Sequence, residues 1–393
     1  MPGRRRNVLV LGATYSLMSP LSHAINAYSA LYFSELGASP AEVGLISAVF
    51  SLASGASAVL GGYLADRVGR KRVIVPLTAV FALSNLAFAY SSSVLHLLAA
   101  SLVSGLSLAY SPALDAILKD SMPEESMGRE SAVLFSVSEA AGLAGPALAG
   151  LLVSRLGLEG GCRLLYAALF AAAAASAGLR LLLVETVAER PAGSLRGFAE
   201  DYSRLLRRLR GDFGRLLLSV GLSWSAHGTA WTFLQLYAVG ELGVSPELWG
   251  VAYSATGVVF LAVNVVWGWL ADRFGPARTM SAAQLLASTA TLLLGVGPRS
   301  PWTALAYMGA SALYTDYPAY FSLSARLIPP GERAKASAVE EWVSSLFSSA
   351  SSTAGGLLYG VEPRLAFLAC AALLAAASAV SGSIEPAGEG DGL

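Results

Sequence analysis

Four ionisable side chains lie inside long apolar stretches of the sequence: His23, Glu139, His227 and Asp316. A charged group at the centre of a membrane-spanning helix costs about 2.5–3.5 kcal/mol on insertion scales, so each of these residues is a functional candidate. A desolvated carboxyl group and a histidine can both exchange protons near neutral pH. We therefore expect proton coupling at Glu139 or Asp316, although hydrogen bonds from neighbouring helices would also satisfy a purely structural carboxyl group.

Polar and aromatic residues accompany both histidines at helical spacing. His23 shares a helix face with Ser16, Ser19 and Asn26, three or four residues apart. Aromatic rings and hydroxyl groups near His227 and Asp316 suit an organic solute, and a hydrogen-bonded packing role is the alternative for each histidine. The candidate solute-binding residues are His23, Asn26, Trp224, His227, Trp231, Gln235, Asp316, Tyr317 and Tyr320.

The elements that carry these residues are long apolar helices. Of the 393 residues, 55% are hydrophobic and 13% are charged, whereas soluble proteins have about 25% charged residues. A hydrocarbon core of about 30 Å needs roughly 20 apolar residues in a helix. Runs of that length predict twelve spans, at residues 8–33, 42–65, 72–91, 94–119, 130–155, 162–183, 214–239, 247–271, 277–295, 301–326, 335–360 and 364–383.

The distribution of basic residues predicts the orientation of these spans. With a cytoplasmic amino terminus, the outer loops contain only Arg155, Arg163, Arg299 and Arg364 of the 26 Lys and Arg residues. The positive-inside rule then places both termini in the cytoplasm. Segment 185–213 is cytoplasmic too, and its apolar residues at helical spacing predict an amphipathic helix on the inner membrane surface or a solvated linker helix.

The sequence repeats itself with an offset of 206 residues. Glu35-Leu36-Gly37 matches Glu241-Leu242-Gly243, and residues 62–67 match residues 268–273 at all positions but one. Because the offset covers six helices, both halves have the same topology and are related by an axis along the membrane normal. We therefore predict an all-α membrane protein of two six-helix bundles, 1–184 and 214–393, joined by the linker 185–213.

The turn after the second span carries the most specific motif. Residues 62–71 read Gly-Tyr-Leu-Ala-Asp-Arg-Val-Gly-Arg-Lys, which resembles the loop between helices 2 and 3 of the major facilitator superfamily. Residues 268–275 are a shorter copy, which departs from the family pattern at Pro276 and Ala277. The resemblance covers essentially the whole chain. It implies a two-bundle transporter that works by alternating access, without a cofactor.

The same resemblance implies a set of gating residues. In the family this loop holds one state of the transporter through contacts near the start of helix 11, and Arg70 would pair with an acid at the end of helix 4, such as Asp120. A simple positively charged turn is the alternative. The gating residues implied are Gly62, Asp66, Arg67, Gly69, Arg70, Asp120, Asp272 and Arg273.

The fifth span contains a second, weaker motif. Gly145, Pro146 and Gly150 look like a degenerate form of a motif of proton-coupled drug exporters, which implies efflux of an amphipathic compound or metabolite. Those exporters usually have an arginine in helix 4, but residues 101–105 read Ser-Leu-Val-Ser-Gly. The missing arginine favours the alternative, uptake of a sugar or organic acid by symport or uniport.

Other functional classes lack their signatures. None of the three lysines follows a glycine, and the sequence has no G-x-S-x-G, no H-E-x-x-H and no Cys/His metal cluster, so we expect neither an ATPase, an enzyme nor a metal site. The net charge is zero, so the sequence lacks the excess of basic residues that is typical of proteins that bind nucleic acid. A transporter-like solute sensor stays an alternative. We expect a monomer in the cytoplasmic membrane whose partners are a small-molecule solute, protons and lipid.

Overall fold

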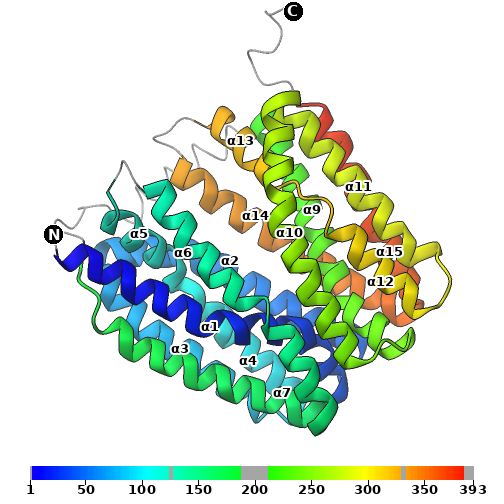
Figure 1. Ribbon diagram of the computed structural model, residues 1–393, viewed down its shortest axis with the longest axis horizontal. Helices are drawn as coiled ribbons and strands as arrows, with labels where there is room; N and C mark the ends of the chain where they lie inside the picture. The colour runs from blue at the N-terminus through cyan, green and yellow to red at the C-terminus, as the bar shows by residue number, and fades with distance from the viewer. Residues whose placement is uncertain (1, 124–126, 187–210, 329–332, 385–393) are drawn as a thin grey trace, which may run out of the picture. The chain divides into compact units, whose positions relative to one another are not determined.

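A computed structural model of the chain describes residues 2–123, 127–186, 211–328 and 333–384. Every regular element within these ranges is a helix, which confirms the predicted all-α fold (Figure 1). The helices of the first half are α1 (Pro2–Glu35), α2 (Pro40–Val68), α3 (Arg70–Ala89), α4 (Val94–Ser107), the 3-10 turn η1 (Leu108–Tyr110), α5 (Ser111–Ser121), α6 (Met127–Gly142) and α7 (Gly145–Arg180). Those of the second half are α9 (Asp212–Gln235), the π-helical η2 (Leu236–Glu241), α10 (Pro246–Phe274), α11 (Pro276–Val296), α12 (Pro301–Ser311), α13 (Tyr317–Leu327), α14 (Arg333–Val361) and α15 (Pro363–Gly382).

The described helices account for the twelve predicted spans. Eight helical stretches are long and apolar enough to cross a membrane. The longest of them, Val133–Arg180, contains Gly157 in a non-helical conformation and therefore holds two spans. The remaining three are α9, the pair α12 and α13, and α14, whose serine-rich sequence lowers its hydropathy.

Three predicted spans are interrupted in the structure, each next to a proline. The span predicted at 94–119 breaks into α4, η1 and α5 before Pro112, the span at 130–155 breaks between α6 and α7 before Pro146, and the span at 301–326 breaks between α12 and α13 before Pro318. Proline has no N–H group to donate to the carbonyl four residues earlier, and its ring disfavours a helical conformation in the residue before it. Each of these spans was predicted as one apolar run, and the structure divides each run into two or three helical segments.

The chain divides into two compact units. The first unit comprises Met1–Ala192 together with Ser245–Ala255, and the second comprises Gly193–Val244 and Thr256–Leu393. The first ten residues of α10 therefore belong to the first unit. The bundle boundaries 1–184 and 214–393 stay a prediction, and the amphipathic helix predicted within 185–213 falls almost wholly outside the described residues.

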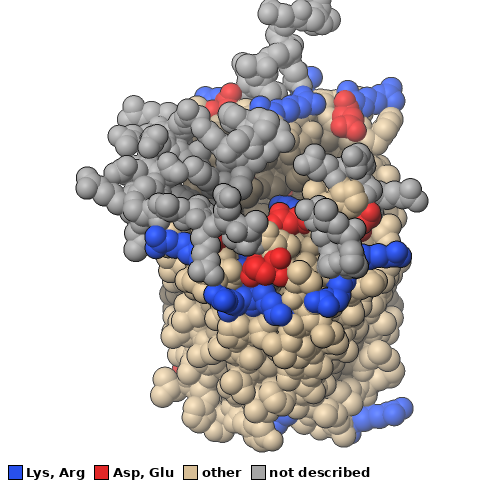
Figure 2. Space-filling view, turned by 90° about the vertical axis from the view of Figure 1, so that its left-hand side faces the viewer, with Lys and Arg blue, Asp and Glu red and all other residues tan. Residues whose placement is uncertain are grey.

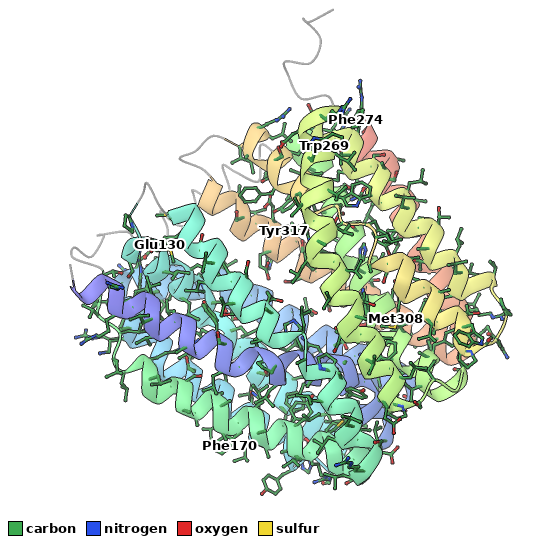
Figure 3. The ribbon with its side chains drawn as sticks, in the orientation of Figure 1. Glu130, Phe170, Trp269, Phe274, Met308 and Tyr317 are labelled. Atoms are coloured by element: carbon green, nitrogen blue, oxygen red, sulfur yellow. The ribbon has the colours of Figure 1, made fainter. Side chains whose placement is uncertain are left out.

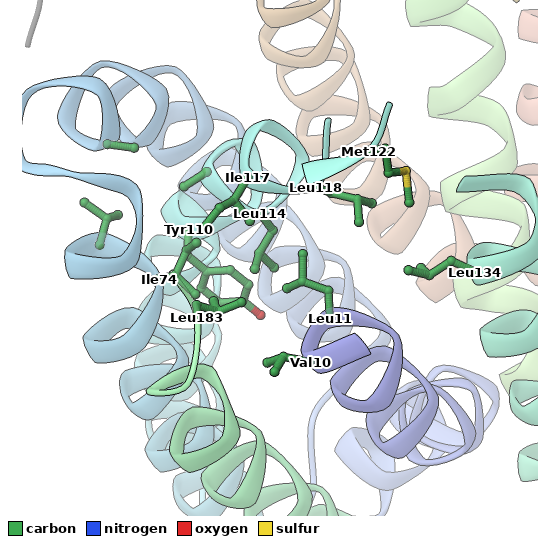
Figure 4. Packing of buried hydrophobic residues seen from close by; sticks show 13 residues of the cluster. Val10, Leu11, Ile74, Tyr110, Leu114, Ile117, Leu118, Met122, Leu134 and Leu183 are labelled. Carbon is green, nitrogen blue, oxygen red and sulfur yellow. The ribbon is translucent and has the colours of Figure 1, made fainter. Parts of the chain in front are cut away.

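In the first unit, α1 and α3 both pack along α7 (Figure 1). Where α1, α3 and α5 meet, a buried apolar cluster fills the space between them (Figure 4). Arg180 is 1% exposed beside this cluster, where it donates a hydrogen bond to Thr78 Oγ1 (2.7 Å) and stacks over the ring of Tyr110 at 5.2 Å. In the second unit, α9 lies against α14 and α15, and α11 lies along α15.

The surface has the charge distribution of a membrane protein. On the face that Figure 2 shows, most Lys, Arg, Asp and Glu side chains lie in the upper half of the view, and the zone below them carries only a few, at its edges. Large apolar side chains such as Leu60, Leu151 and Val265 are exposed. In a lipid environment such side chains are in their preferred solvent.

Candidate functional site

The first unit brings two of the predicted ionisable residues together. His23 lies in α1 and Glu139 in α6, and His23 Nε2 is 3.3 Å from Glu139 Oε2. Their side chains are 27% and 50% exposed, and desolvation of Glu139 in the membrane stays a prediction. Ser16, which was predicted on the same helix face as His23, also faces α6, since its Oγ atom lies 3.3 Å from Ser138 Oγ. Asn26 is exposed.

The hydrogen bond on the other ring nitrogen fixes the protonation pattern of the pair. His23 Nδ1 is 3.0 Å from the backbone oxygen of Ser19. A carbonyl oxygen can only accept, so Nδ1 must carry a hydrogen. The contact between Nε2 and Glu139 then holds one proton, either as imidazolium and carboxylate or as imidazole and carboxylic acid. Loss of that proton would leave two acceptors facing each other.

A glycine makes room for this contact. A Cβ atom on Gly142, at the end of α6, would lie 2.4 Å from Ser19 Oγ and 2.6 Å from His23 Nδ1. Such distances are far shorter than a van der Waals contact. Gly142 therefore allows α6 to approach α1 closely enough for Glu139, one turn earlier, to reach His23.

The second unit holds the other histidine in the same way. His227 Nδ1 is 2.9 Å from the backbone oxygen of Ser223, so this nitrogen also donates. The ring centroid of Tyr314 lies 6.2 Å from that of His227. Within the described ranges, no side chain forms a hydrogen bond or ion pair with His227 Nε2.

Asp316 lies at the break between α12 and α13, where it precedes the first turn of α13. Its Oδ2 atom accepts hydrogen bonds from Ser223 Oγ (2.9 Å) and Gln284 Nε2 (3.1 Å). Ser223 Oγ is also 3.5 Å from His227 Nδ1, so one serine links the two predicted residues. Gln284 lies in α11 and is 1% exposed.

The predicted aromatic residues are less closely grouped. Trp224 is 56% exposed, whereas Trp231 is half-buried and Gln235 is buried. Tyr317, labelled in Figure 3, is exposed on the first turn of α13 and lies 6.1 Å from the ring of Tyr320. Tyr320 donates its hydroxyl hydrogen to Glu340 of α14, so its polar end is directed to that carboxylate and not to Asp316.

The first copy of the gating motif has defined partners in the structure. Arg70 forms an ion pair with Asp120 at the end of α5 and donates to Thr186 Oγ1 (2.9 Å). Asp66 is 4.0 Å from Arg70. Gly69 adopts φ +109° between α2 and α3, which L residues rarely adopt. A Cβ atom on Gly62 would lie 3.7 Å from Pro112 Cβ, whereas one on Gly61 would lie 1.9 Å from the carbonyl oxygen of Ala109.

The second copy has different contacts. Arg273 stacks over the rings of Trp269 (5.1 Å) and Phe274 (5.6 Å), both labelled at the end of α10 in Figure 3. Asp272 is exposed and forms no ion pair with a described residue. Since Pro276 stands where the first copy has Arg70, the second copy lacks the side chain that makes the ion pair.

The motif of the fifth span lies at close helix crossings within the first unit. A Cβ atom on Gly145 would lie 1.9 Å from the carbonyl oxygen of Pro20 in α1, and one on Gly150 would lie 2.8 Å from that of Pro246. A Cβ atom on Gly250 would lie 2.2 Å from the carbonyl oxygen of Pro146. These three glycines let α1, α7 and the first residues of α10 meet backbone to backbone.

Several residues of these sites were missed from the sequence. Gln284 is a polar amide in an apolar span, a signal that was available. Ser223 stands four residues before His227 as Ser19 stands before His23, so the spacing also signals it. Glu185 accepts from the backbone N–H groups of Arg70 (3.2 Å) and Lys71 (3.1 Å). No pattern in the sequence connects it to them across more than a hundred residues.

Comparison with known proteins identifies the family of this chain. The sequence profile of the Major Facilitator Superfamily matches residues 9–213 and 216–387. The chain belongs to the Major Facilitator Superfamily. It is therefore a membrane transporter and not an enzyme. A similar curated protein is the multi-drug resistance efflux pump PmrA homolog of Lactococcus lactis subsp. lactis (strain IL1403), 31% identical over 152 residues, which are 38% of this chain and 36% of that protein.

Solved structures share the superfamily fold over nearly the whole chain. A bacterial homolog of the human lysosomal transporter Spinster, in an inward-facing and unoccupied conformation, has a TM-score of 0.78 at 17% identity and covers 97% of both chains. A peptide transporter POT in complex with sulfate has a TM-score of 0.74 at 13% identity and covers 96% of this chain and 93% of its own. The nucleoside transporter NupG has a TM-score of 0.70 at 17% identity and covers 96% and 98%. At these identities the likeness concerns the fold alone.

Proposed function

We propose that this superfamily member is a proton-coupled exporter of small amphipathic organic compounds. The contact between His23 Nε2 and Glu139 Oε2, at 3.3 Å, carries the proposal. With Nδ1 committed as a donor to Ser19, the two groups stay in contact only while they share one proton. Binding and release of that proton would make and break the link between α1 and α6.

The pair is suited to respond to protons alone. Among the described residues, the groups that interact with His23 or Glu139 are Ser19 and the two residues themselves. No basic or second acidic side chain therefore competes for the proton. A proton taken up at this pair changes a contact between two helices of one bundle, which is the kind of two-state element that can couple a gradient to a conformational change.

One further observation favours export from the cytoplasm. The partial relative from Lactococcus lactis is an efflux pump by name, although the alignment spans about a third of its length. The basic residues support an orientation in the cytoplasmic membrane with both termini inside. The alternating-access cycle, the monomeric state and this orientation are parts of the proposal.

The proposal is tested by dye transport in proteoliposomes that hold the purified full-length protein. An amphipathic dye such as ethidium is supplied on one side, the membrane potential is clamped, and a gradient of about one pH unit is imposed. One proton exchanged per solute then supports at most about tenfold accumulation, because tenfold corresponds to about 1.4 kcal/mol. We expect the unmodified protein to approach this value.

The variants Glu139→Gln and His23→Gln should lose the accumulation and keep downhill dye flux. Glu159→Gln is the matched control, since Glu159 pairs with Arg163 one turn away in the same unit and does not contact His23. Accumulation by Glu139→Gln equal to that of the unmodified protein would remove the pair from the coupling step. Absence of any dye flux in the unmodified protein would contradict the exporter itself.

Uptake of a sugar or organic acid is the second candidate. It is supported by residues 101–105 in α4, which lack the arginine usual in drug exporters of this superfamily. The same proteoliposomes separate the two candidates when the orientation of the protein is fixed by selective labelling. Proton and solute movement in opposite directions supports export, and movement in the same direction supports uptake.

A further inference from the structure

The side-chain hydrogens of Gln284 and Ser223, the two residues that donate to Asp316, all have acceptors within the protein. Gln284 Nε2 has two hydrogens, and it has two acceptors, Ser219 Oγ (3.1 Å) and Asp316 Oδ2 (3.1 Å). The hydroxyl hydrogen of Ser223 has an acceptor in the same carboxylate oxygen at 2.9 Å. The orientation of Gln284 is fixed from its other end, because Ser381 Oγ donates to its Oε1 atom at 2.8 Å. No hydrogen of Gln284 is left for another molecule.

Two hydrogen-bond acceptors, His227 Nε2 and Asp316 Oδ1, in contrast have no donor among the described residues. His227 donates through Nδ1 to Ser223, so the neutral ring presents a lone pair at Nε2. Asp316 uses Oδ2 for both of its hydrogen bonds, and none of the described residues donates to Oδ1. Ser223, which contacts both residues, holds these two acceptors in one region of the second unit.

Asp316 forms no ion pair with a basic side chain in the ranges that the structure describes. In the second unit, Arg215 pairs with Asp212, Arg299 pairs with Glu362, Arg273 stacks over Trp269 and Arg364 donates to the carbonyl oxygen of Gly297. None of these four arginines pairs with Asp316. A half-buried carboxylate with only neutral donors gains most from a ligand that brings a positive charge.

We propose that the second unit binds the solute through a protonated amine, with N–H groups donating to Asp316 Oδ1 and His227 Nε2. This inference rests on the proposed function and names the class of solute. The ring of Tyr314, 6.2 Å from that of His227, adds an aromatic face of the kind that favours cations. An organic anion, which brings acceptors and negative charge, is disfavoured next to Asp316, because the side-chain donors of Gln284 and Ser223 already have acceptors.

Four ligands of similar size test whether binding requires a positive charge, N–H donors or both. Phenethylamine has the charge and the N–H donors, phenethyltrimethylammonium has the charge alone, 2-phenylethanol has a donor without charge, and 3-phenylpropionate has the opposite charge. Each is added to the purified full-length protein in detergent, and ligand binding is measured from the rise in the apparent unfolding temperature. We expect phenethylamine to bind roughly ten- to hundredfold more tightly than the other three, the range expected for hydrogen bonds to a charged group.

The variants Asp316→Asn and His227→Ala should weaken phenethylamine binding, the first by roughly ten- to hundredfold. His227→Ala keeps the test valid if Asp316→Asn does not fold. Glu362→Gln is the matched control, an acid of the same unit that pairs with Arg299. The hydrogen bond to Glu362 raises the pKa of Arg299, so this arginine keeps its charge throughout the assay.

Three results would overturn the inference: stabilisation by 3-phenylpropionate equal to that by phenethylamine, equal binding of the trimethylated cation, or unchanged phenethylamine binding in both variants. Because these measurements need no transport, they are independent of the dye assay. Failure here together with gradient-driven dye accumulation would remove the amine site and leave the exporter proposal intact.

Discussion

At the scale of single residues, the two histidines show how a shared local arrangement leads to different chemistry. Each donates through Nδ1 to the carbonyl oxygen of a serine four residues earlier. In the first unit the remaining nitrogen meets a carboxyl group, whereas in the second it meets no described side chain. The sequence predicted both histidines as functional candidates. It could not predict the partner of His23, because Glu139 lies 116 residues away and only the packing of α6 on α1 brings it close.

Gly142 offers a direct test at this scale. Gly142→Ala places a methyl group within 2.8 Å of the His23 ring and of Ser19 Oγ. Forcing a group into such a space costs about 1–3 kcal/mol unless the neighbours move. We expect the ring to move away from Glu139, so the variant should lose gradient-driven dye accumulation.

Gly178→Ala is the control for that substitution. Gly178 lies in α7, and its added methyl group would meet no atom within 4 Å. Both variants gain the helix propensity of alanine, about 1 kcal/mol, so the difference between them reports the contact with His23. Gradient-driven accumulation that is equal in the two variants would show that the His23 ring keeps its place.

At the scale of elements, the turn between α2 and α3 is stabilised by more than its motif. Glu185, which follows α7, accepts from two backbone N–H groups in the first turn of α3. A carboxylate at a helix amino terminus is favoured both by these hydrogen bonds and by the helix dipole. The motif predicted the glycine and the two charged residues of this turn, but the capping acid comes from a segment with no recognisable pattern.

The two copies of the turn provide a matched pair of variants. Gly69 and Gly275 both have positive φ, +109° and +88°, so alanine at either position costs about 1–3 kcal/mol of backbone strain. At Gly69 the new Cβ atom would also lie 2.8 Å from Glu185 Oε2. We expect Gly69→Ala to destabilise the protein by about 1 kcal/mol more than Gly275→Ala, the typical contribution of a cap.

Thermal unfolding of both variants in detergent would measure the difference. In the background Glu185→Ala, the carboxylate is absent and the two glycine variants should become equivalent. A difference that persists in that background would assign the extra destabilisation of Gly69→Ala to something other than the cap.

At the scale of the whole molecule, the repeat is visible in the backbone as well as in the sequence. Among the described residues six glycines have positive φ, and four of them form two pairs separated by 206 residues: Gly37 with Gly243 and Gly69 with Gly275. The apolar runs were sufficient to predict the number of spans, and the resemblance of residues 62–71 to a known motif was sufficient to predict the family. They could not predict that the first ten residues of α10 belong to the first unit, because that depends on contacts with α1 and α7.

Those contacts can be weakened selectively. Tyr28 donates to the carbonyl oxygen of Pro246 (2.6 Å), and Trp249 Nε1 donates to that of Ala27 (2.7 Å). Each such hydrogen bond contributes about 1 kcal/mol. The double variant Tyr28→Phe with Trp249→Phe should therefore speed amide hydrogen exchange in residues 246–255 by roughly tenfold or more.

Residues 256–274 of the same helix are the internal control for that measurement. They belong to the second unit. Neither the hydrogen bond of Tyr28 to Pro246 nor that of Trp249 to Ala27 involves them. Equal acceleration along the whole of α10 would indicate that the helix opens as one piece.

Three prolines of the chain also remove an amide hydrogen close to an ionisable residue. Pro20 lies inside α1, where it leaves the carbonyl oxygen of Ser16 without its helical donor two turns before His23. Pro146 and Pro318 lie in the first turns of α7 and α13, so the residues four positions earlier, Gly142 and Tyr314, lie at or beyond the end of the preceding helix, close in sequence to Glu139 and Asp316. In lipid, a backbone oxygen without a helical donor must be satisfied by water, by a neighbouring side chain or by the cargo itself.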